Sequence, residues 1–288
     1  MIAVFGPTAV GKTAVALALA GLLRDRGEQV EAISADALAV YRGLEILTAA
    51  PAGHRLVGFV PVDREFSVGE YMPLAHAAVD EALEHGARPL VVGGTGLYLR
   101  AALADLSLAP PPPCALRRRL EAELVRRGPA ALHAELAERA PTLAARIQPS
   151  DRSRIVRSLE RTALGRSIEP DESELWSAKF RHPTRLIGLT MDRDELYRRV
   201  DARVDEMLAA GAADEVRRAV AAGASRTARK ALGFEELLAG DVDGMKRRSR
   251  NYAKRQLTWM RKLPDVEVID LTGRAPDDVA GQIADGVR

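Results

Sequence analysis

The sequence predicts an α/β protein with a parallel sheet, split by an all-helical insertion. Three observations predict this class. A short apolar run at residues 2–5 leads into a glycine-rich loop and then into an Ala- and Leu-rich helical pattern at 13–23, the order in which a doubly wound sheet begins. Further strand patterns recur along the chain, and one long stretch between them is wholly helical. The 288 residues with 47% hydrophobic content suit a soluble enzyme with one insertion.

Each element is predicted from its local pattern, in chain order. Strands are expected where short apolar runs occur, at residues 2–5, 30–34, 90–93, 185–190 and 266–271. A helix is expected at 73–85, between the second and third strands, so these strands should be parallel and buried. The run Pro110–Pro113 is too stiff and too poor in donors for a helix or a strand, and we interpret it as a linker.

Beyond this linker the pattern is helical. Helices are expected at 115–127, 130–139 and 152–165, with breaks marked by Pro141, Pro149 and Gly165. The predicted organisation is a first core part at 1–110, a helical insertion at 111–182, and a second core part at 183–288 that carries basic C-terminal helices.

Composition bounds the cellular context. Cys114 is the only cysteine, so no internal disulfide and no zinc-binding cysteine cluster is expected. The opening apolar run ends at Gly6, which is too short for a signal peptide or a membrane span. We therefore expect a cytoplasmic protein with no membrane partner, acting as a monomer.

The clearest motif is Gly6-Pro7-Thr8-Ala9-Val10-Gly11-Lys12-Thr13, which fits the pattern GxxxxGK[ST]. It lies between an expected strand and an expected helix, the context that this motif requires. The glycines allow consecutive N–H groups to turn inward around an anion, Lys12 adds positive charge, and the Thr13 hydroxyl can ligate Mg²⁺. The motif predicts a P-loop NTPase-like core that holds two linked phosphates. It leaves open whether they belong to ATP, GTP or another diphosphate.

Two further groups follow expected strands. Asp36 comes shortly after the second strand, at the carboxyl edge of a parallel sheet, where ligands bind in open α/β folds. There it can be a base or a metal ligand, or it can cap the next segment, and its position does not choose between these roles. The third strand runs into Gly93–Gly96, where an ordinary P-loop hydrolase has an acidic residue. This ending disfavours an ATPase or GTPase and makes the Thr95 hydroxyl a candidate substrate contact.

Positive charge is concentrated locally although the net charge is only +2. The stretch 245–262 has no acidic residue and carries Lys246, Arg247, Arg248, Arg250, Lys254, Arg255, Arg261 and Lys262. Inside the expected insertion, Arg154, Arg157 and Arg161 fall on one face of a helix and an apolar stripe falls on another. Such charge suits an anionic partner such as a phosphate backbone, and it also suits a solvated surface with ion pairs.

With these motifs in place, the sequence resembles the tRNA dimethylallyltransferase family, also called tRNA isopentenyltransferases. The resemblance covers nearly the whole chain and rests on seven ordered motifs: Gly6–Thr13, Ile33–Asp36 with Val40–Gly43, His54–Leu56, Val92–Tyr98, Pro149–Asp151 with Arg154-Ile155 and Leu159-Glu160, Ala231–Phe234, and Ala253–Trp259. In that family a P-loop α/β core carries a helical insertion that grips the anticodon arm. The resemblance thus implies the organisation that the local patterns predict.

The resemblance also implies a role for each residue that matches a family motif. Asp36 would be the general base, Thr95 would position the target adenine and Asp36, and Lys12 would act on the departing diphosphate. With Mg²⁺ on Thr13, the diphosphate of dimethylallyl diphosphate would be held by Gly6, Pro7, Thr8, Ala9, Val10, Gly11, Lys12, Thr13 and Lys230. The anticodon stem-loop of tRNA would contact Asp36, Ala37, Leu38, Ala39, Thr95, Ser153, Arg154, Ile155, Val156 and Arg157.

The implied reaction transfers a dimethylallyl group to the exocyclic amine of the adenine immediately 3′ of the anticodon, in tRNAs reading codons that begin with U. The chain departs from the family at Ala37 and Ala39, which replace polar residues, and at Ala50, where a Lys usually precedes Pro51. Two other enzymes fit part of the pattern: a P-loop kinase of a nucleoside or small metabolite, and a prenyltransferase acting on free adenine nucleotides. The hypothesis of a non-catalytic RNA-binding protein would explain the basic stripes, but it gives no function to the phosphate-binding loop or to Asp36.

Overall fold

The computed structural model describes residues 1–108, 112–165 and 175–286 and divides into two compact units. The core unit comprises Met1–Leu106 with Trp176–Arg288, and the helical unit comprises Ser107–Leu175. The predicted divisions, after residues 110 and 182, fall slightly later in the chain. Of the expected proline linker, Pro110 and Pro111 lie outside the described residues, and Pro113 immediately precedes the first helix of the helical unit.

Across the described residues, the core unit contains one five-stranded parallel sheet with the strand order β2-β3-β1-β4-β5. Its strands are β1 (Ile2–Phe5), β2 (Val30–Ser34), β3 (Arg88–Gly93), β4 (Arg185–Thr190) and β5 (Glu267–Asp270). The central strand β1 is wholly apolar because helices cover both faces of the sheet, so that every one of its side chains is buried. The predicted α/β class with a parallel sheet is confirmed.

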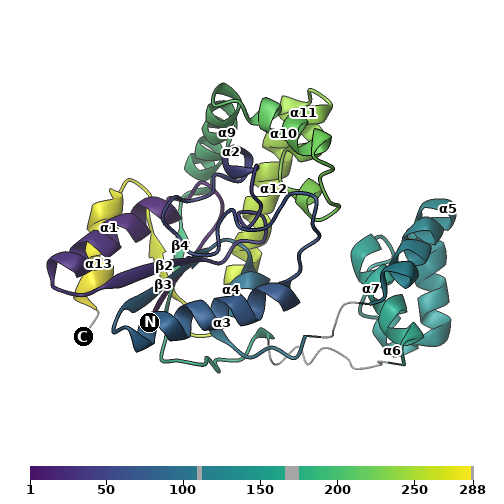
Figure 1. Ribbon diagram of the computed structural model, residues 1–288, viewed down its shortest axis with the longest axis horizontal. Coiled ribbons are helices and arrows are strands. Elements are labelled where there is room, and N and C mark those ends of the chain that lie inside the picture. Colours follow the sequence, from purple (N-terminus) through teal and green to yellow (C-terminus); the bar gives the residue numbers. More distant parts are fainter. Residues whose placement is uncertain (109–111, 166–174, 287–288) are drawn as a thin grey trace. The chain divides into compact units, whose positions relative to one another are not determined.

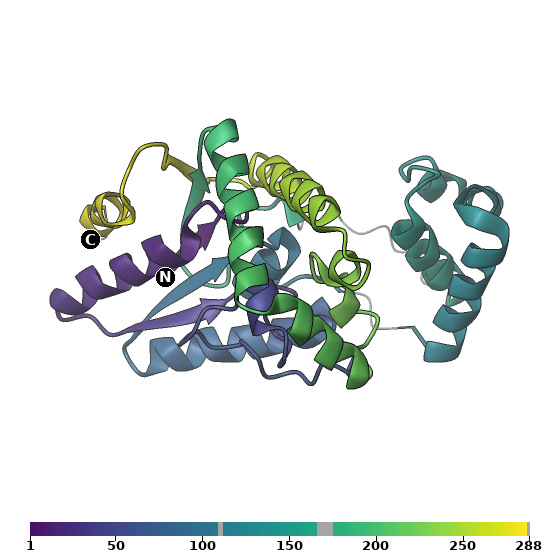
Figure 2. The ribbon, with the colours of Figure 1, turned by 90° about the horizontal axis from the view of Figure 1, so that it is seen from above.

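Helices surround this sheet in two layers. The helical elements described in the core unit are α1 (Lys12–Asp25), α2 (Glu45–Thr48), α3 (Val68–Glu84), α4 (Gly96–Leu103), α9 (Arg193–Ala209), α10 (Ala212–Ala221), the 3₁₀ helix η1 (Ala228–Lys230), α11 (Phe234–Leu238), α12 (Val242–Met260) and α13 (Pro276–Asp285). Helices α1 and α13 lie side by side on one face of the sheet, and α3 covers the other (Figures 1 and 2). Because all strands are parallel, the loops that follow β1, β2 and β3 meet at one edge.

Helix α3 begins more than a turn before the expected start at Pro73. Ser67 and Glu70 form a capping box: the Ser67 hydroxyl accepts the Glu70 N–H at 3.4 Å, and the Glu70 carboxylate accepts the Ser67 N–H at 3.0 Å. This pair satisfies donors at the helix end that would otherwise lack partners. The predicted start at Pro73 was wrong because the Ser67–Glu70 capping box begins the helix earlier, and the helix tolerates Pro73 inside.

The helical unit consists, in its described part, of α5 (Cys114–Arg139), α6 (Pro141–Ala144) and α7 (Arg152–Ala163). Helix α5 is two helices joined at a kink, because Gly128 has φ 79° and cannot continue the helix. The expected break between residues 127 and 130 lies at this kink. Leucines from both halves of α5 pack with Ile155 and Leu159 of α7 in a core of their own.

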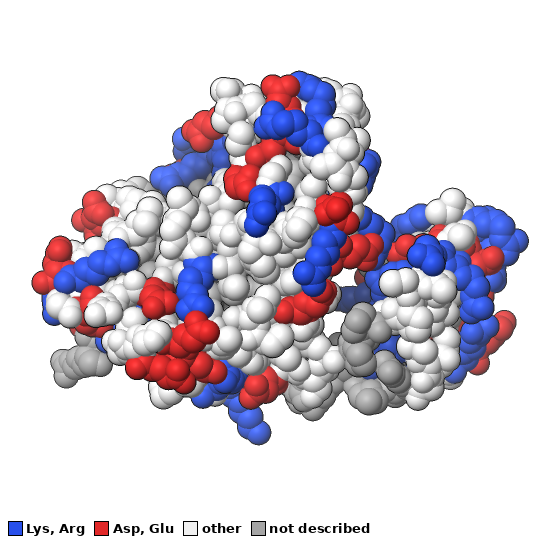
Figure 3. Space-filling view, in the orientation of Figure 1, with Lys and Arg blue, Asp and Glu red and all other residues white. Residues whose placement is uncertain are grey.

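Two surface observations concern the partners expected from the sequence. On the face of the core unit seen in Figure 3, acidic and basic side chains are interspersed rather than gathered into one basic field. None of the helices in the described ranges combines the length and the apolar character that crossing a bilayer requires.

Candidate active site

The loop between β1 and α1 forms a concave set of free backbone donors. Ala9 (φ 65°) and Gly11 (φ 107°) adopt left-handed conformations, which turn successive N–H groups toward one side. Within the described part of the chain, the N–H groups of Ala9, Gly11, Lys12 and Thr13 have no acceptor. A non-glycine residue with positive φ costs free energy, and such strain concentrates at functional sites. These donors and the N-terminus of α1 are suited to bind linked phosphates.

Lys12 is held over this loop. Its Nζ donates to the carbonyl oxygens of Gly6 at 3.0 Å and Pro7 at 2.8 Å. The pKa of Lys12 is lowered to about 7, chiefly by burial and also by the positive charge of Arg203, and the negative charge of Asp36 offsets part of both effects. An anion bound in the loop would neutralise the repulsion between these cations, so the ligand-free site favours a ligand rich in negative charge.

We expect pyrophosphate affinity to depend on pH through Lys12. A bound anion raises the pKa of Lys12 above its ligand-free value of about 7, so binding takes up a proton where free Lys12 is neutral. Pyrophosphate affinity should therefore fall as the pH rises above 7, by at most about tenfold per pH unit. Calorimetric titration in two buffers of different ionisation enthalpy measures this proton uptake directly.

Lys12→Arg is the matched control, because a guanidinium stays charged over the whole range. The difference between the wild type and this variant cancels the protonation of pyrophosphate itself. Equal pH dependence in the two proteins would show that Lys12 is already charged in the ligand-free loop.

Asp36 lies in a tight turn after β2. Its Oδ1 accepts the N–H groups of Leu38 at 2.9 Å and Ala39 at 3.3 Å, and among the described residues no donor bonds to Oδ2. The Thr95 hydroxyl accepts the Ala37 N–H at 3.4 Å and thereby ties this turn to the end of β3. One carboxylate oxygen thus fixes the turn while the other is available to a proton donor.

One face of α12 contacts the segment that follows β3. The Tyr252 hydroxyl lies 3.3 Å from the Thr95 hydroxyl, and Gln256 is bonded to Gly94. Burial and, to a smaller extent, the negative charge of Asp36 raise the pKa of Tyr252 to about 12, so this phenol stays protonated. Tyr252 was not singled out from the sequence, although it and Gln256 share a helix face at i and i+4.

The glycines around Thr95 are explained by close packing. A Cβ atom at Gly93 would clash with the Ala35 backbone, one at Gly94 with the Gln256 amide, and one at Gly96 with the Trp259 ring. The Gly-Gly-Thr-Gly sequence therefore brings β2, β3 and α12 together around the Thr95 hydroxyl.

Arg203 of α9 is a second cation at the loop that the sequence pattern did not reveal. Burial lowers the pKa of Arg203, and the negative charges of Asp36 and Glu206 raise it in part, while the positive charge of Arg203 lowers the pKa of Lys12. Arg199 lies one turn earlier on α9, with a guanidinium nitrogen 4.0 Å from the position of a Cβ on Gly11. The spacing of the two arginines was visible, but only the strand order places β4 and its following helix beside β1.

Two residues proposed from the family resemblance are placed less directly. Lys230 is the last residue of η1 and is exposed, and its contact with a diphosphate stays a prediction. Ala39 is 2% exposed, its N–H is bonded to Asp36 and its carbonyl oxygen accepts the Gly58 N–H. Ala39 thus supports the Asp36 turn from inside, and its side chain does not form part of a surface for tRNA.

In the helical unit, the residues proposed to contact tRNA divide into two sets. Ile155 and Val156 are 0% and 5% exposed and belong to the core of the unit, so their side chains cannot contribute to an RNA surface. Ser153 and Arg154 are exposed at the start of α7. Arg157 is partly buried and lies 3.4 Å from Glu160, which limits its reach but leaves it on the same side as Arg154.

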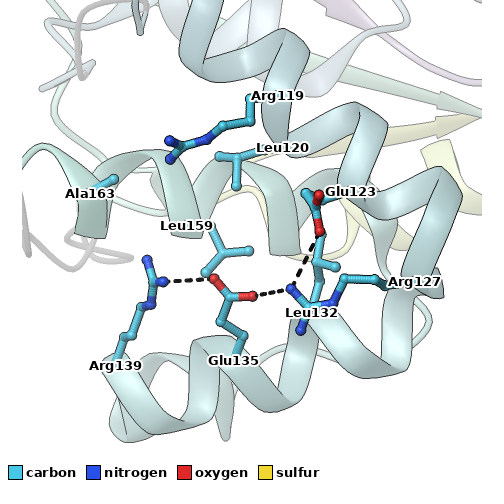
Figure 4. Close-up of a pocket in the computed structure, with 9 residues that line it drawn as sticks. All are labelled: Arg119, Leu120, Glu123, Arg127, Leu132, Glu135, Arg139, Leu159 and Ala163. Atoms are coloured by element: carbon cyan, nitrogen blue, oxygen red, sulfur yellow. Dashed lines mark hydrogen bonds and ion pairs between the residues drawn. The ribbon is translucent and has the colours of Figure 1, made fainter.

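A buried ion pair joins the two helices of this unit. Both oxygens of Glu160, which is 0% exposed, accept hydrogen bonds of 2.5 Å from Arg117 of α5. The neighbouring cavity between α5 and α7 has a volume of about 290 Å³. At its mouth Arg127 and Arg139 both pair with Glu135 (Figure 4). The charges of Arg127 and Arg139 are therefore neutralised by an ion pair within the unit, and both side chains contribute to its packing.

The residues of the core unit fit a metal that arrives with a diphosphate. No group of three or more His, Cys, Asp or Glu that could hold a metal ion occurs in the part of the chain that the structure describes. The Thr13 side chain is exposed at the first turn of α1, beside the free loop amides. Mg²⁺ commonly binds through one or two protein ligands, substrate phosphates and water, and this donor set is consistent with that mode.

Comparison with known proteins identifies the family. The IPP transferase family model matches residues 39–263. A tRNA dimethylallyltransferase from Symbiobacterium thermophilum is 41% identical, with 95% of this chain and 90% of that protein covered. The crystal structure of the full-length tRNA isopentenylpyrophosphate transferase from Bacillus halodurans matches with a TM-score of 0.69 and 34% identity, over 99% of this chain and 94% of that one.

A eukaryotic dimethylallyltransferase solved while acting on tRNA shares the fold, with a TM-score of 0.68 and 23% identity, over 94% of this chain and 74% of that one. The sequence motifs, the parallel sheet with its P-loop, and the near-complete coverage of bacterial relatives agree. This chain belongs to the IPP transferase family, the tRNA dimethylallyltransferases.

Proposed function

We propose that this chain transfers the dimethylallyl group of dimethylallyl diphosphate to the exocyclic amine of the adenine 3′ of the anticodon, in tRNAs reading codons that begin with U. The observation that carries the proposal is the meeting of Lys12 and Asp36. Lys12 lies on a loop of free phosphate-binding donors and beside Gly94. The next residue, Thr95, holds the turn of Asp36, in which one carboxylate oxygen is available to a proton. The names of the bacterial relatives support the same activity.

The chemistry follows from the nature of the amine. Its lone pair is delocalised into the adenine ring, and its proton is too weakly acidic for a carboxylate to remove in advance. The nitrogen therefore attacks the allylic carbon while its proton passes to Asp36, so that the N–C bond forms as the N–H bond breaks. Oδ2 is the receiving atom, because Oδ1 is occupied by the Leu38 and Ala39 N–H groups.

The leaving group departs into the loop. As the bond between the allylic carbon and oxygen breaks, the electron pair goes to the diphosphate, whose negative charge grows. The loop amides and Lys12 lie where that charge develops, and Arg203 is a further cation close by. Thr13 and the diphosphate oxygens would hold Mg²⁺, which would neutralise part of the same charge.

The adenine must leave its stack to reach Asp36, which costs less in an anticodon loop than in a duplex. The turn that contains Asp36, tied to β3 through Thr95, would receive the unstacked base. Arg154, exposed at the start of α7, would contact the RNA backbone. The core unit would then carry out the chemistry, and the helical unit would contribute part of the RNA affinity.

A direct assay tests the proposal. Dimethylallyl diphosphate labelled in the isoprenoid is incubated with an unmodified anticodon stem-loop, with the same RNA in which guanine replaces the target adenine, and with adenosine monophosphate. Label should enter only the adenine-containing stem-loop. Equal labelling of the free nucleotide would favour a free-nucleotide prenyltransferase, and transfer of the terminal phosphate of ATP to a nucleoside instead would favour a kinase.

Neutralising the stripe on α7 should weaken tRNA binding without changing pyrophosphate binding. Replacing Arg154, Arg157 and Arg161 by Gln removes up to three phosphate contacts. The slope of log affinity against log salt should then flatten, by at most roughly 0.7 to 0.9 per lost contact. Glu160 keeps its two bonds from Arg117 in this variant, so the helical unit should stay folded. A salt titration of stem-loop affinity measures the effect.

Arg126→Gln serves as a control, because Arg126 is an exposed arginine of the same unit, paired with Glu123. Melting temperatures show whether any variant has lost stability. An unaltered salt slope in a folded triple variant would show that these arginines of α7 do not contact the RNA. The basic stretch 245–262 would then be the candidate for RNA binding.

A further inference from the structure

Gln256 forms a buried bridge between the P-loop and the end of β3. Its Oε1 accepts the Thr8 N–H at 2.8 Å, and its Nε2 donates to the Gly94 carbonyl oxygen at 2.7 Å. The side chain is 4% exposed. Because one partner can only donate and the other can only accept, a single orientation of the amide satisfies both.

This bridge joins the two halves of the site without occupying either. On one side lies the loop, whose free donors at Ala9 and at residues 11–13 are not used by Gln256. On the other side Gly94 precedes Thr95, whose hydroxyl holds the Asp36 turn. The bridge therefore sets the distance between the donors for the departing diphosphate and the groups that handle the adenine.

The rest of the α12 face supports this arrangement. Tyr252 precedes Gln256 by one turn and contacts Thr95, and Trp259 follows it and packs against Gly96. Residues spaced by three and four positions share one face of a helix. The residues that follow β3 thus contact one helix, α12. Of Tyr252, Gln256 and Trp259, only Gln256 also bonds to the P-loop.

We infer that Gln256 is a positioning residue for prenyl transfer, which holds the diphosphate loop in register with Thr95 and Asp36. The inference rests on the proposed function. A displacement of reacting groups by about 1 Å can lower a rate on the order of 10²-fold. The phosphate-binding amides are left in place when the bridge is lost, so the effect should fall on the rate of transfer and not on diphosphate affinity.

Gln256→Met provides the first test, because Met keeps the length of the side chain and removes both hydrogen bonds. Its single-turnover transfer rate at saturating substrate should fall roughly 10²-fold, while the dissociation constant for inorganic pyrophosphate stays close to the wild-type value. Ser249→Ala changes a buried residue of the same helix, 6% exposed and outside the site, and should leave both quantities unchanged.

Gly94→Ala breaks the same bridge from the other side. The added methyl group would clash with the Gln256 amide and would also lie 3.3 Å from the Lys12 Nζ and the Gly6 carbonyl oxygen, so in this variant the pyrophosphate affinity should fall together with the rate. If the two substitutions act through one bridge, their effects should not add: the double variant should be little slower than Gly94→Ala alone. Gln256→Glu keeps the inference testable if Gln256→Met fails to fold, because Glu retains an acceptor for the Thr8 N–H and loses the donor to the Gly94 carbonyl oxygen.

Three results would overturn the inference: an unchanged transfer rate in folded Gln256→Met, equal losses of rate and pyrophosphate affinity in Gln256→Met, or additive losses of rate in the double variant. The proposed function fails separately, if the wild-type protein transfers no label to the stem-loop, and the inference then fails with it. Active wild type with an equally active Gln256→Met overturns the positioning role alone.

Discussion

Asp36→Asn is expected to slow prenyl transfer by about 10²–10⁴-fold, the range for loss of a positioned general base. The fold should persist, because the Asn side-chain oxygen can accept the same N–H groups of Leu38 and Ala39 that Oδ1 accepts. The amide nitrogen would then stand in the position of Oδ2, a donor where the adenine proton needs an acceptor. Single-turnover transfer of labelled dimethylallyl measures the effect.

The charge of Asp36 also acts on Lys12, whose pKa it raises. Removing that charge should lower the pKa of Lys12, so the two rates are best compared at saturating dimethylallyl diphosphate, whose negative charge raises the same pKa in both proteins. Asp63→Asn makes the same charge change at an exposed aspartate and should retain the wild-type rate. Near-normal turnover of Asp36→Asn would mean that Asp36 serves only the turn.

Lys12→Ala is expected to weaken pyrophosphate binding and also to lower the chemical rate, the latter by roughly 10²–10³-fold. The ammonium lies against the Gly6 and Pro7 carbonyl oxygens, at the loop that receives the leaving group. An interaction that strengthens as charge accumulates stabilises the transition state more than the bound substrate. Calorimetric binding of pyrophosphate and the single-turnover rate separate the two effects.

Lys179→Ala removes an exposed lysine of the core unit and serves as the charge-matched control. It should change neither pyrophosphate affinity nor rate. Unchanged affinity and rate in Lys12→Ala itself would show that the loop holds something other than the reacting diphosphate.

Much of the fold was predictable because its signals are local. The runs at 2–5, 30–34 and 185–190 correspond to β1, β2 and β4, since strands of a sheet covered on both faces are rich in apolar residues. Of these three strands, only β1 is apolar throughout. The loop motif and the break near Gly128 were equally visible, because each depends on backbone conformations that few residues adopt. The start of α3 was missed, although the Ser67-x-x-Glu70 pattern that caps it is also local.

The candidate site was predictable only in part. Lys12 and Asp36 stand at recognisable positions beside strands, and the structure brings their charges together. The glycines beside Thr95 were interpreted as a sign of a hydroxyl contact, and the structure adds that they admit Ala35, Gln256 and Trp259 at close range. Ile155 and Val156 were expected to contact tRNA because they match a family motif. A motif match does not show whether a side chain is buried, and both side chains lie in the core of the helical unit.

The sequence by itself determined the α/β class, the phosphate-binding loop, the helical insertion and the family, because these depend on periodicity, conformational preference and motif order along the chain. Only the tertiary structure decided which distant residues complete the site. Tyr252 reaches Thr95, Gln256 reaches Thr8, and Arg203 lies close enough to Lys12 to lower its pKa. These contacts depend on strand order and on which helix face packs against which loop, and a local pattern of residues carries neither.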